Sequence, residues 1–193
     1  MNAEALDPVA VAVLDFWFST AGSHERDVWF RKDVVFDTEI RARFGVAVDI
    51  ALAGGLGQWC ASAKGALARI ILLDQFPRNI HRDTPMAFAG DARALATAQD
   101  AVARELDRAL DPFGRWFMYM PFEHAEDSEA QRRSLELFGG LAASSGLTAA
   151  LEWAQKHADV IARFGRYPHR NELLGRKSTQ LELEFLKQPN SSF

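Results

Sequence analysis

Basic side chains are concentrated in one stretch near the C-terminus, residues 163–176, which reads Arg-Phe-Gly-Arg-Tyr-Pro-His-Arg-Asn-Glu-Leu-Leu-Gly-Arg. Glycine and proline interrupt this stretch, so its charges lie on irregular backbone and not on a solvated helix face. Residues 75–79 (Gln-Phe-Pro-Arg-Asn) repeat its aromatic, proline, arginine, asparagine order in a shorter form. Arginine forks bind carboxylates and phosphates through two parallel hydrogen bonds. The two segments therefore predict the binding of an anion.

Polar residues also stand near one end of three predicted helices, on faces that are otherwise apolar: Asp74, the group 127–131, and His157. The two arginine segments begin directly after two of those helices, so we expect the helix ends to converge on one pocket. Glu123 belongs to this pocket, with Trp116 or Tyr119 near its wall. The predicted ligand-binding residues are Asp74, Arg78, Arg82, His124, Glu126, Arg166, His169 and Arg170.

The same residues have a structural interpretation. Asp74 and the acidic group around Glu126 can neutralise Arg78, Arg166 and Arg170, and the network then only fixes the positions of the loops. Removing one partner of such a buried pair costs about 3 to 5 kcal/mol, so loss of stability on mutation does not separate the two interpretations. Both stay open at the level of sequence.

Metal and cofactor binding are not predicted. His124 lies close to several acidic residues, but the chain has no Glu-x-x-His pair and no His-Glu-x-x-His helix. His157 falls on an apolar stripe and is expected to be a hydrogen-bonded histidine of the core. The single cysteine, Cys60, excludes an intrachain disulfide and a multi-cysteine metal site.

Composition sets the class of protein. A chain of 193 residues that is 48% hydrophobic fits one compact domain, predicted over 1–187, with a flexible tail over 188–193. The net charge of −4 gives no general attraction to nucleic acid. The lone cysteine, the acidic start of the chain and the lack of a long apolar run predict a cytoplasmic protein that is not inserted in a membrane. The oligomeric state is left open.

Helix signals recur along the whole chain, and no segment shows convincing strand alternation. Asp, Ser and Thr caps, together with Pro and Gly stops, predict an all-α fold of antiparallel helix pairs joined by short turns. A closed bundle and a curved, solenoid-like stack both fit, because no repeat period is evident. The expected helices cover 9–18, 33 or 37 to 52, 62 to 76 with Pro77 as the stop, 91–110 with Asp91 as the cap, 111 to 120 with Pro121 as the stop, 126–145, 148–164, and 178 or 179 to 186.

Three motifs resemble those of the bacterial family catalogued as domain of unknown function 924: residues 73–79 (Leu-Asp-Gln-Phe-Pro-Arg-Asn), 120–127 (Met-Pro-Phe-Glu-His-Ala-Glu-Asp) and 164–171 (Phe-Gly-Arg-Tyr-Pro-His-Arg-Asn). The resemblance covers nearly the whole chain. It implies a fold similar to tetratricopeptide repeat (TPR) proteins, a right-handed superhelical stack, and no established activity. Asp91 is also at a motif position of this family. The departures are His81 for an aromatic residue, Asp83 for glycine and Tyr167 for phenylalanine.

The leading functional hypothesis is a helical binding protein with an Arg/His-lined pocket for an anionic small molecule or a peptide carboxylate. The alternative is a cofactor-independent hydrolase or lyase, in which His124 or His169 acts as general base and Glu126 orients it. A purely structural protein-interaction module is the third hypothesis. Catalytic residues are not assigned.

Overall fold

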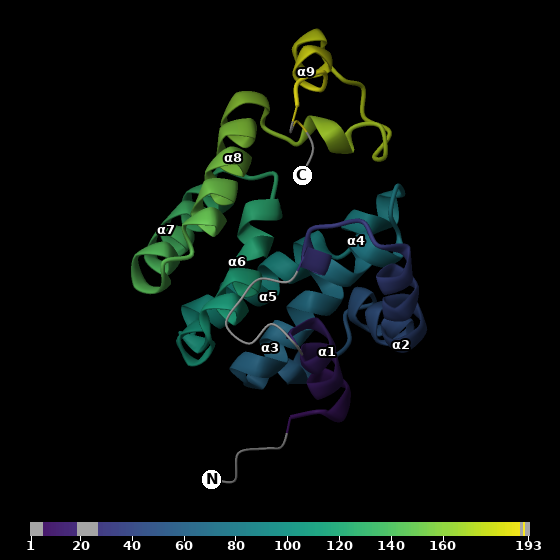
Figure 1. The fold of residues 1–193 in the computed structure, drawn as a ribbon, viewed down its shortest axis with the longest axis vertical. Helices are drawn as coiled ribbons and strands as arrows, with labels where there is room; N and C mark the ends of the chain where they lie inside the picture. Colours follow the sequence, from purple (N-terminus) through teal and green to yellow (C-terminus); the bar gives the residue numbers. More distant parts are fainter. Residues whose placement is uncertain (1–5, 19–26, 190, 192–193) are drawn as a thin grey trace.

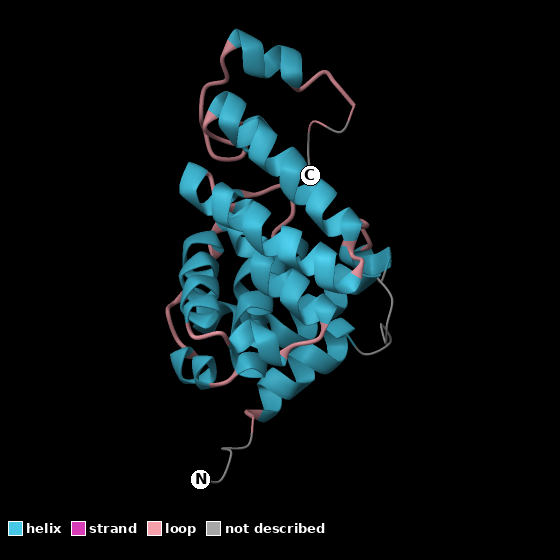
Figure 2. Ribbon diagram, turned by 90° about the vertical axis from the view of Figure 1, so that its left-hand side faces the viewer, coloured by secondary structure: helices cyan, strands magenta, loops and turns pink. Residues whose placement is uncertain are grey.

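The computed structural model describes residues 6–18, 27–189 and 191. In these residues all regular structure is helical, as predicted, and no strand is present (Figure 2). The α-helices are α1 Pro8–Phe18, α2 Val34–Leu52, α3 Ala63–Ile70, α4 Phe76–Ile80, α5 Asp91–Ala103, α6 Pro112–His124, α7 Ser128–Ser145, α8 Thr148–Phe164 and α9 Gln180–Phe185. Shorter elements are the 3₁₀ turns η1 Asp27–Trp29, η2 Gly57–Ala61, η4 Pro85–Phe88, η5 Leu106–Ala109 and η6 Pro168–Arg170, and the π-helical turn η3 Ile71–Gln75.

The predicted caps set many of the helix starts. Asp7 accepts a hydrogen bond from the Val9 amide at 2.8 Å, and Asp33 caps α2 through two backbone amides. Ser62 and Asp127 cap α3 and α7 in the same way. Thr179 forms a reciprocal capping box with the third residue of α9. These are local contacts, which explains why sequence alone located them.

Two prolines predicted to end helices lie inside them. Pro77 does not stop the third helix, because the π turn η3 precedes it and the chain then continues as α4. In that turn the Phe76 amide bonds to the Ile71 carbonyl, five residues back, and a π bulge of this kind widens the helix. Pro121 lies within α6, one turn before its end, where residues 116–124 are all buried. Tertiary packing there outweighs the usual cost of a helical proline.

The predicted helix over 91–110 is divided, and Asp91 does not cap it. Helix α5 ends at Ala103, and Glu105 adopts a left-handed conformation with φ 58° before η5 begins. Asp91 is the first residue of α5 and makes no side-chain cap hydrogen bond. Its carboxylate is engaged by arginines instead, which is a tertiary contact that the cap prediction did not include.

One close approach brings the start of α5 to the π turn. A Cβ atom on Gly90 would lie 2.0 Å from the Leu73 carbonyl oxygen, which is far inside contact distance. Glycine is therefore required here by the neighbouring backbone. This contact places the start of α5 against η3. Asp91 therefore lies beside Arg78 of α4, which also contacts Asp74 of η3.

Aromatic side chains fill the core between the N-terminal helices and α6. Trp17 of α1 packs edge-on against Phe76 and Phe117, with ring centroids 5.6 and 5.5 Å away. All three side chains are completely buried. Geometries of this kind add about 0.5–1.5 kcal/mol per pair beyond the burial of area. The core thus fixes η3, α4 and α6, the elements that carry the polar network.

Helices α7 and α8 form a pair that packs against α6, and α9 lies at the far end of the molecule from α1 (Figure 1). The single-domain boundary at 187 and the TPR-like superhelix stay predictions, and residues 190, 192 and 193 of the predicted tail lie outside the described residues. Among the described residues, no helix combines the length and apolar character needed to cross a membrane.

Candidate functional site

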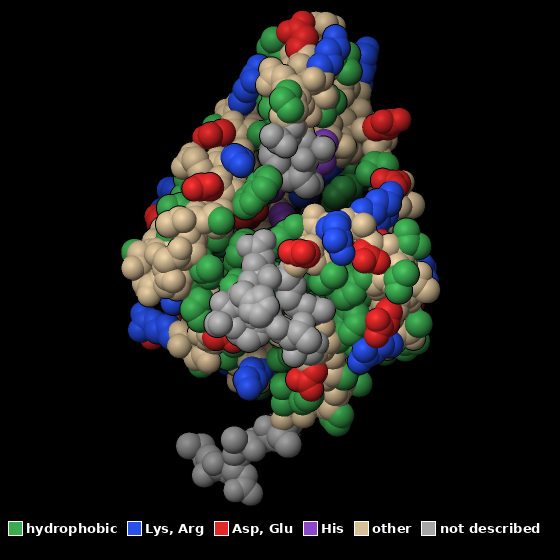
Figure 3. Space-filling view, viewed as in Figure 1, with side chains coloured by type: hydrophobic (Ala, Val, Ile, Leu, Met, Phe, Trp, Pro, Cys, Tyr) green, Lys and Arg blue, Asp and Glu red, His purple; other side chains and the backbone are tan. Residues whose placement is uncertain are grey.

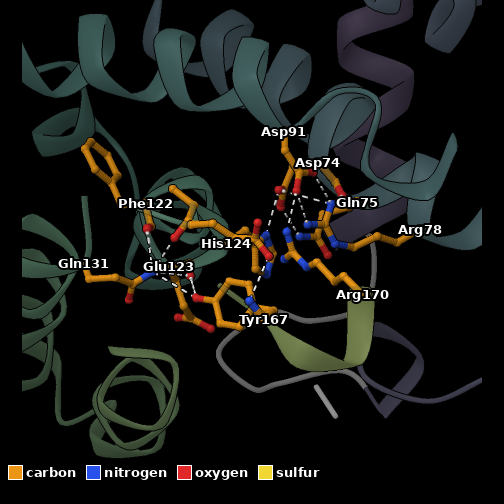
Figure 4. A network of polar contacts seen from close by, with 12 residues as sticks. Asp74, Gln75, Arg78, Asp91, Phe122, Glu123, His124, Gln131, Tyr167 and Arg170 are labelled. Carbon is orange, nitrogen blue, oxygen red and sulfur yellow. Dashed lines mark hydrogen bonds and ion pairs between the residues drawn. The ribbon is translucent and has the colours of Figure 1, made fainter. Parts of the chain in front are cut away.

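A carboxylate shared by two arginines lies where η3, α4, α5 and η6 meet (Figure 4). Asp91 Oδ1 is 2.9 Å from Arg78 Nη1, and its Oδ2 is 3.2 Å from Arg78 Nη2 and 3.1 Å from Arg170 Nη1. Arg78 also contacts Asp74 through the backbone carbonyl and, at 3.4 Å, the carboxylate. The two guanidinium groups therefore converge on one small region, which we call the arginine pair, Arg78 and Arg170.

Arg170 is held between two aromatic rings. Its guanidinium carbon lies 4.7 Å from the centre of the Phe88 ring and 4.5 Å from that of Tyr167. Only 8% of its side chain is exposed, and its buried Nε has no hydrogen-bond partner. Burial and the neighbouring positive charge of Arg78 lower the pKa of Arg170. The Nε–H group of Arg170 is thus a buried donor that can bind a further acceptor.

Asp74 is the completely buried anion of the network. Its Oδ1 lies 2.7 Å from His124 Nδ1, and Gln75 donates to its Oδ2. Burial alone would raise the pKa of Asp74, but His124 and Arg78 outweigh burial and hold that pKa below its usual value. Asp74 is therefore ionised at neutral pH and accepts from both neighbours.

His124 ends α6 and is oriented by Asp74. Burial lowers the pKa of His124 although the Asp74 charge opposes that shift. The neutral ring donates from Nδ1 to the carboxylate, so its lone pair is on Nε2. For His124, this arrangement corrects the hypothesis that Glu126 orients the base, because Asp74 occupies that position. The version with His169 stays a prediction.

Beyond His124 lies a second buried group, formed by Glu123 and His157. Glu123 Oε1 is 3.1 Å from His157 Nδ1, which is also 2.9 Å from the Trp153 carbonyl oxygen. Oε2 of Glu123 is buried and has no hydrogen-bond partner. Burial raises the pKa of Glu123 to about 8, and burial lowers that of His157 to about 3.

Gln131 and Tyr167 fix the backbone around this group. Gln131 Nε2 lies 2.8 Å from the Glu123 and Ala125 carbonyl oxygens and 2.9 Å from the Tyr167 hydroxyl, so its two N–H groups are shared among these acceptors. Tyr167 in turn donates its hydroxyl to the Glu123 carbonyl. The end of α6 is thereby tied to α7 and to the loop after α8, which holds His124 in place.

The structure brings together four of the eight predicted site residues: Asp74, Arg78, His124 and Arg170. His169 lies beside them, with its ring centroid 5.7 Å from that of Tyr167, and burial together with Arg170 lowers its pKa to about 4.

The other three predicted residues form separate pairs. Arg82 binds Asp37, with Nη2 2.9 Å from Oδ1, and Arg166 binds Glu182 through two hydrogen bonds of 2.7 and 2.9 Å. Glu126 accepts from Arg176 and from the Tyr167 amide. Each of the three ion pairs joins a loop residue to a charged partner.

Asp91 and His157 belong to the network, but the sequence pattern suggested other roles for them. Asp91 stood at a family motif position, but its place at the start of a helix suggested a cap. His157 was assigned to the core because of its apolar stripe, and the core location is correct. Its contact with Glu123 was missed because the two residues come from different helices.

A hollow opens over this region between the C-terminal elements and the rest of the molecule, and histidine and basic side chains are visible in it (Figure 3). Other depressions lie away from the network. One, of about 280 Å³, is lined by α1, α3 and α6, and another lies beside Tyr119 and Arg133. Tyr119 bonds to Asp107 there, so it does not form the predicted wall of the site.

Known proteins provide a comparison for the fold. The structure is similar to that of the protein of unknown function ATU0120 from Agrobacterium tumefaciens, with 40% sequence identity and a TM-score of 0.84. The similarity covers 93% of this chain and 97% of that one. No curated protein sequence matches this chain. The model of a bacterial protein family of unknown function, DUF924, matches residues 13–190, and the chain belongs to that family.

Proposed function

We propose that this protein is a cytoplasmic binding protein in which the arginine pair holds an anionic small molecule or a peptide carboxylate. The observation that carries the proposal is the sharing of Asp91 by two guanidinium groups while the buried Nε of Arg170 has no acceptor. The proposal keeps the expected TPR-like stack, whose repeats commonly present concave surfaces to partners. The net charge of −4 argues against nucleic acid as the anion.

The balance of donors and acceptors favours a ligand. A buried donor without an acceptor costs about 1–3 kcal/mol. Asp74 and Asp91 balance the formal charge of the arginine pair, but Asp74 also accepts hydrogen bonds from His124 and Gln75. A carboxylate or phosphate ligand would supply further oxygen acceptors for the N–H groups of the two guanidinium groups.

The walls of the site strengthen such contacts. Phe88 and Tyr167 exclude water from the faces of Arg170 and leave its edges for hydrogen bonding. Arg78 is 22% exposed and Asp91 19%, so this part of the network is reachable from solvent. His124 and His169 are neutral at pH 7 and can donate to or accept from an uncharged part of the ligand.

The test compares two carboxylates that each hold arginine. Thermal unfolding is measured with inorganic phosphate and with malonate, at constant ionic strength set with NaCl. A ligand that binds only the folded state raises its stability by about 2.7 kcal/mol at a hundred times its Kd. Asp91→Asn should lower the melting temperature without added anion and increase the rise that phosphate or malonate produces, because the internal competitor is gone.

Asp37→Asn is the matched control, since it leaves Arg82 without its carboxylate at a similar depth. It should lower the melting temperature without increasing the response to anions. Equal anion responses in the two variants would indicate general screening of charge. No response in either the wild type or Asp91→Asn would establish the network as structural and favour the protein-interaction module.

A second candidate function is carried by the 2.7 Å contact between Asp74 and His124. A carboxylate that fixes an imidazole tautomer is the arrangement of a general base. In a cofactor-independent hydrolase or lyase, Nε2 of His124 would take the proton and the arginine pair would stabilise the developing anion.

The enzyme hypothesis is tested with p-nitrophenyl acetate and p-nitrophenyl phosphate as chromogenic substrates. Turnover should fall by at least about a hundredfold in His124→Gln, the range expected for loss of a general base. His81→Gln serves as the control, because His81 lies outside the network at the end of α4. A folded His124→Gln protein with unchanged turnover would exclude this base.

A further inference from the structure

Three buried residues on the inner side of the network come from two helices. Glu123 and His124 end α6, and His157 lies on α8. One potential ligand atom from each lies within 4.8 Å of the other two, and all three side chains are buried. Neither Arg78 nor Arg170 belongs to this group.

A hydrogen-bond acceptor lies next to Nδ1 of each of the two histidines. Asp74 accepts from His124 Nδ1 at 2.7 Å, and the Trp153 carbonyl oxygen lies 2.9 Å from His157 Nδ1. Metal-binding histidines almost always donate their other ring nitrogen to a carboxylate or a backbone carbonyl, which fixes the ring and makes the ligand nitrogen more basic. His124 has this support from Asp74, which leaves Nε2 as its ligand atom. His157 has it from the Trp153 carbonyl when it binds through Nε2, and its Nδ1 also lies 3.1 Å from Glu123 Oε1.

The carboxyl group of Glu123 supplies a second, independent indication. Its side chain is 3% exposed, and its Oε2 is buried without a hydrogen-bond partner. A buried carboxyl oxygen that is left unpaired is costly unless something else occupies the site. The oxygen belongs to the same group as the two imidazoles, so one cation can bind to all three residues.

We propose that Glu123, His124 and His157 bind one divalent transition-metal ion, with Zn²⁺ as the expected occupant. Two imidazoles and one carboxylate suit Zn²⁺, and also Fe²⁺, Co²⁺ and Ni²⁺. Around tetrahedral Zn²⁺ the ligand atoms lie about 3.4 Å apart, so binding requires the ligand atoms to approach one another by up to about 1.4 Å. Three protein ligands leave a further position for water.

The charges are compatible with this assignment. A divalent ion with one carboxylate ligand keeps one positive charge. Asp74, which contacts His124, offsets part of that charge, because it also lies beside Arg78. The sequence favoured no metal because the third ligand lies on a different helix from the other two. The inference does not depend on anion binding by Arg78 and Arg170, since neither arginine contributes a metal ligand. His124 is the one residue named for both sites.

The experiment uses the full chain, freed of any affinity tag and of metal with EDTA. Zn²⁺ binding is measured by calorimetry, and Co²⁺ is added in parallel because its visible absorption reports the number and geometry of ligands. We expect one Zn²⁺ per chain, a higher melting temperature with Zn²⁺, and a Co²⁺ spectrum of a four-coordinate site.

Glu123→Gln and His157→Gln should each weaken Zn²⁺ binding by at least about tenfold, since even residues behind the ligands contribute tenfold to a hundredfold. His81→Gln should bind Zn²⁺ as the wild type does. Circular dichroism verifies that each variant is folded. If His157→Gln does not fold, Glu123→Gln and the wild-type Co²⁺ spectrum decide the question.

Absence of stoichiometric binding by the wild type would overturn the inference, as would unchanged affinity in a folded Glu123→Gln or His157→Gln protein. Arg170→Gln separates this result from the anion proposal. It should lose the thermal response to phosphate in metal-free protein and keep its affinity for Zn²⁺. Loss of Zn²⁺ binding in Arg170→Gln would contradict the separation of the two sites.

Discussion

Two groups of ion pairs can be compared: Arg82 with Asp37, and the arginine pair with Asp91. Both join guanidinium to carboxylate, but the first has one arginine on the carboxylate and the second has two. Arg82 places Nε and Nη2 on the two oxygens of Asp37, one guanidinium on one carboxylate, and Asn79 adds a further hydrogen bond. Asp91 receives two guanidinium groups on its two oxygens. The exposed fractions are similar, 29% and 14% for Arg82 and Asp37 against 22% and 19% for Arg78 and Asp91.

The difference gives a criterion for distinguishing a structural ion pair from the proposed anion site. In the Arg82 pair, both carboxylate oxygens bind a single arginine, and the contact links α2 to the end of α4. In the Asp91 group, one carboxylate is divided between two cations, and Arg170 keeps a buried donor without an acceptor. Burial and charge are thus less informative than the count of donors and acceptors.

The largest expected effect comes from moving Asp91 away from its arginines. Gly90→Ala would place a Cβ atom 2.0 Å from the Leu73 carbonyl oxygen, so the start of α5 must shift. We expect a loss of about 3 kcal/mol in the free energy of unfolding, at the upper end for overpacking, measured with urea. Gly139→Ala is the control, because nothing lies within 4 Å of its Cβ position in α7.

Gly139→Ala should be neutral or stabilising by up to about 1 kcal/mol, the gain expected for alanine over glycine in a helix. A Gly90→Ala protein as stable as the wild type would mean that α5 can move freely. The close contact would then not be what sets Asp91 against Arg78.

A second prediction separates stability from binding. Arg82→Gln removes the arginine that pairs with Asp37 and should cost about 1–2 kcal/mol, between the values for surface and buried pairs. Arg170→Gln leaves Asp91 paired with Arg78, so it should lower the affinity for phosphate at least tenfold. Calorimetry and urea unfolding of both variants test this contrast, and equal loss of phosphate binding in the two would remove it.

The smallest expected effect concerns pH. Burial and Arg170 lower the pKa of His169 to about 4, whereas Glu126 opposes the shift. The pKa of an unfolded histidine is near its usual value of 6.5. Between these two values the unfolded state binds more protons, so the folded state loses stability as the pH falls from 6.5 to about 4. His169→Gln should reduce this loss, seen as a flatter plot of melting temperature against pH.

Comparison of variant with wild type cancels the titration of the other buried groups, Glu123, His124 and His157. Parallel profiles for His169→Gln and the wild type in this pH range would show that His169 is protonated equally in the folded and unfolded states. The described side-chain contacts between Arg82 and Asp37 include no histidine. Arg82→Gln should therefore leave the slope of melting temperature against pH unchanged.

Much of the fold could be predicted because its determinants are local. Asp33 and Thr179 bond to amides two or three residues away, and Gly165 ends α8 in the left-handed conformation that favours glycine. Pro77 and Pro121 were misjudged for the opposite reason. Whether a proline ends a helix depends on the surrounding packing, and both lie where the chain is buried on all sides.

The sequence by itself determined that the chain is helical, where most helices begin, and that Asp74, Arg78, His124 and Arg170 are inward polar residues. Only the tertiary structure decided which acid meets which base. Asp91 and Arg170 are 79 positions apart, and Asp74 and His124 are 50 apart. No local pattern encodes such pairs, because their distances depend on how α5, α6 and η6 pack around a common core.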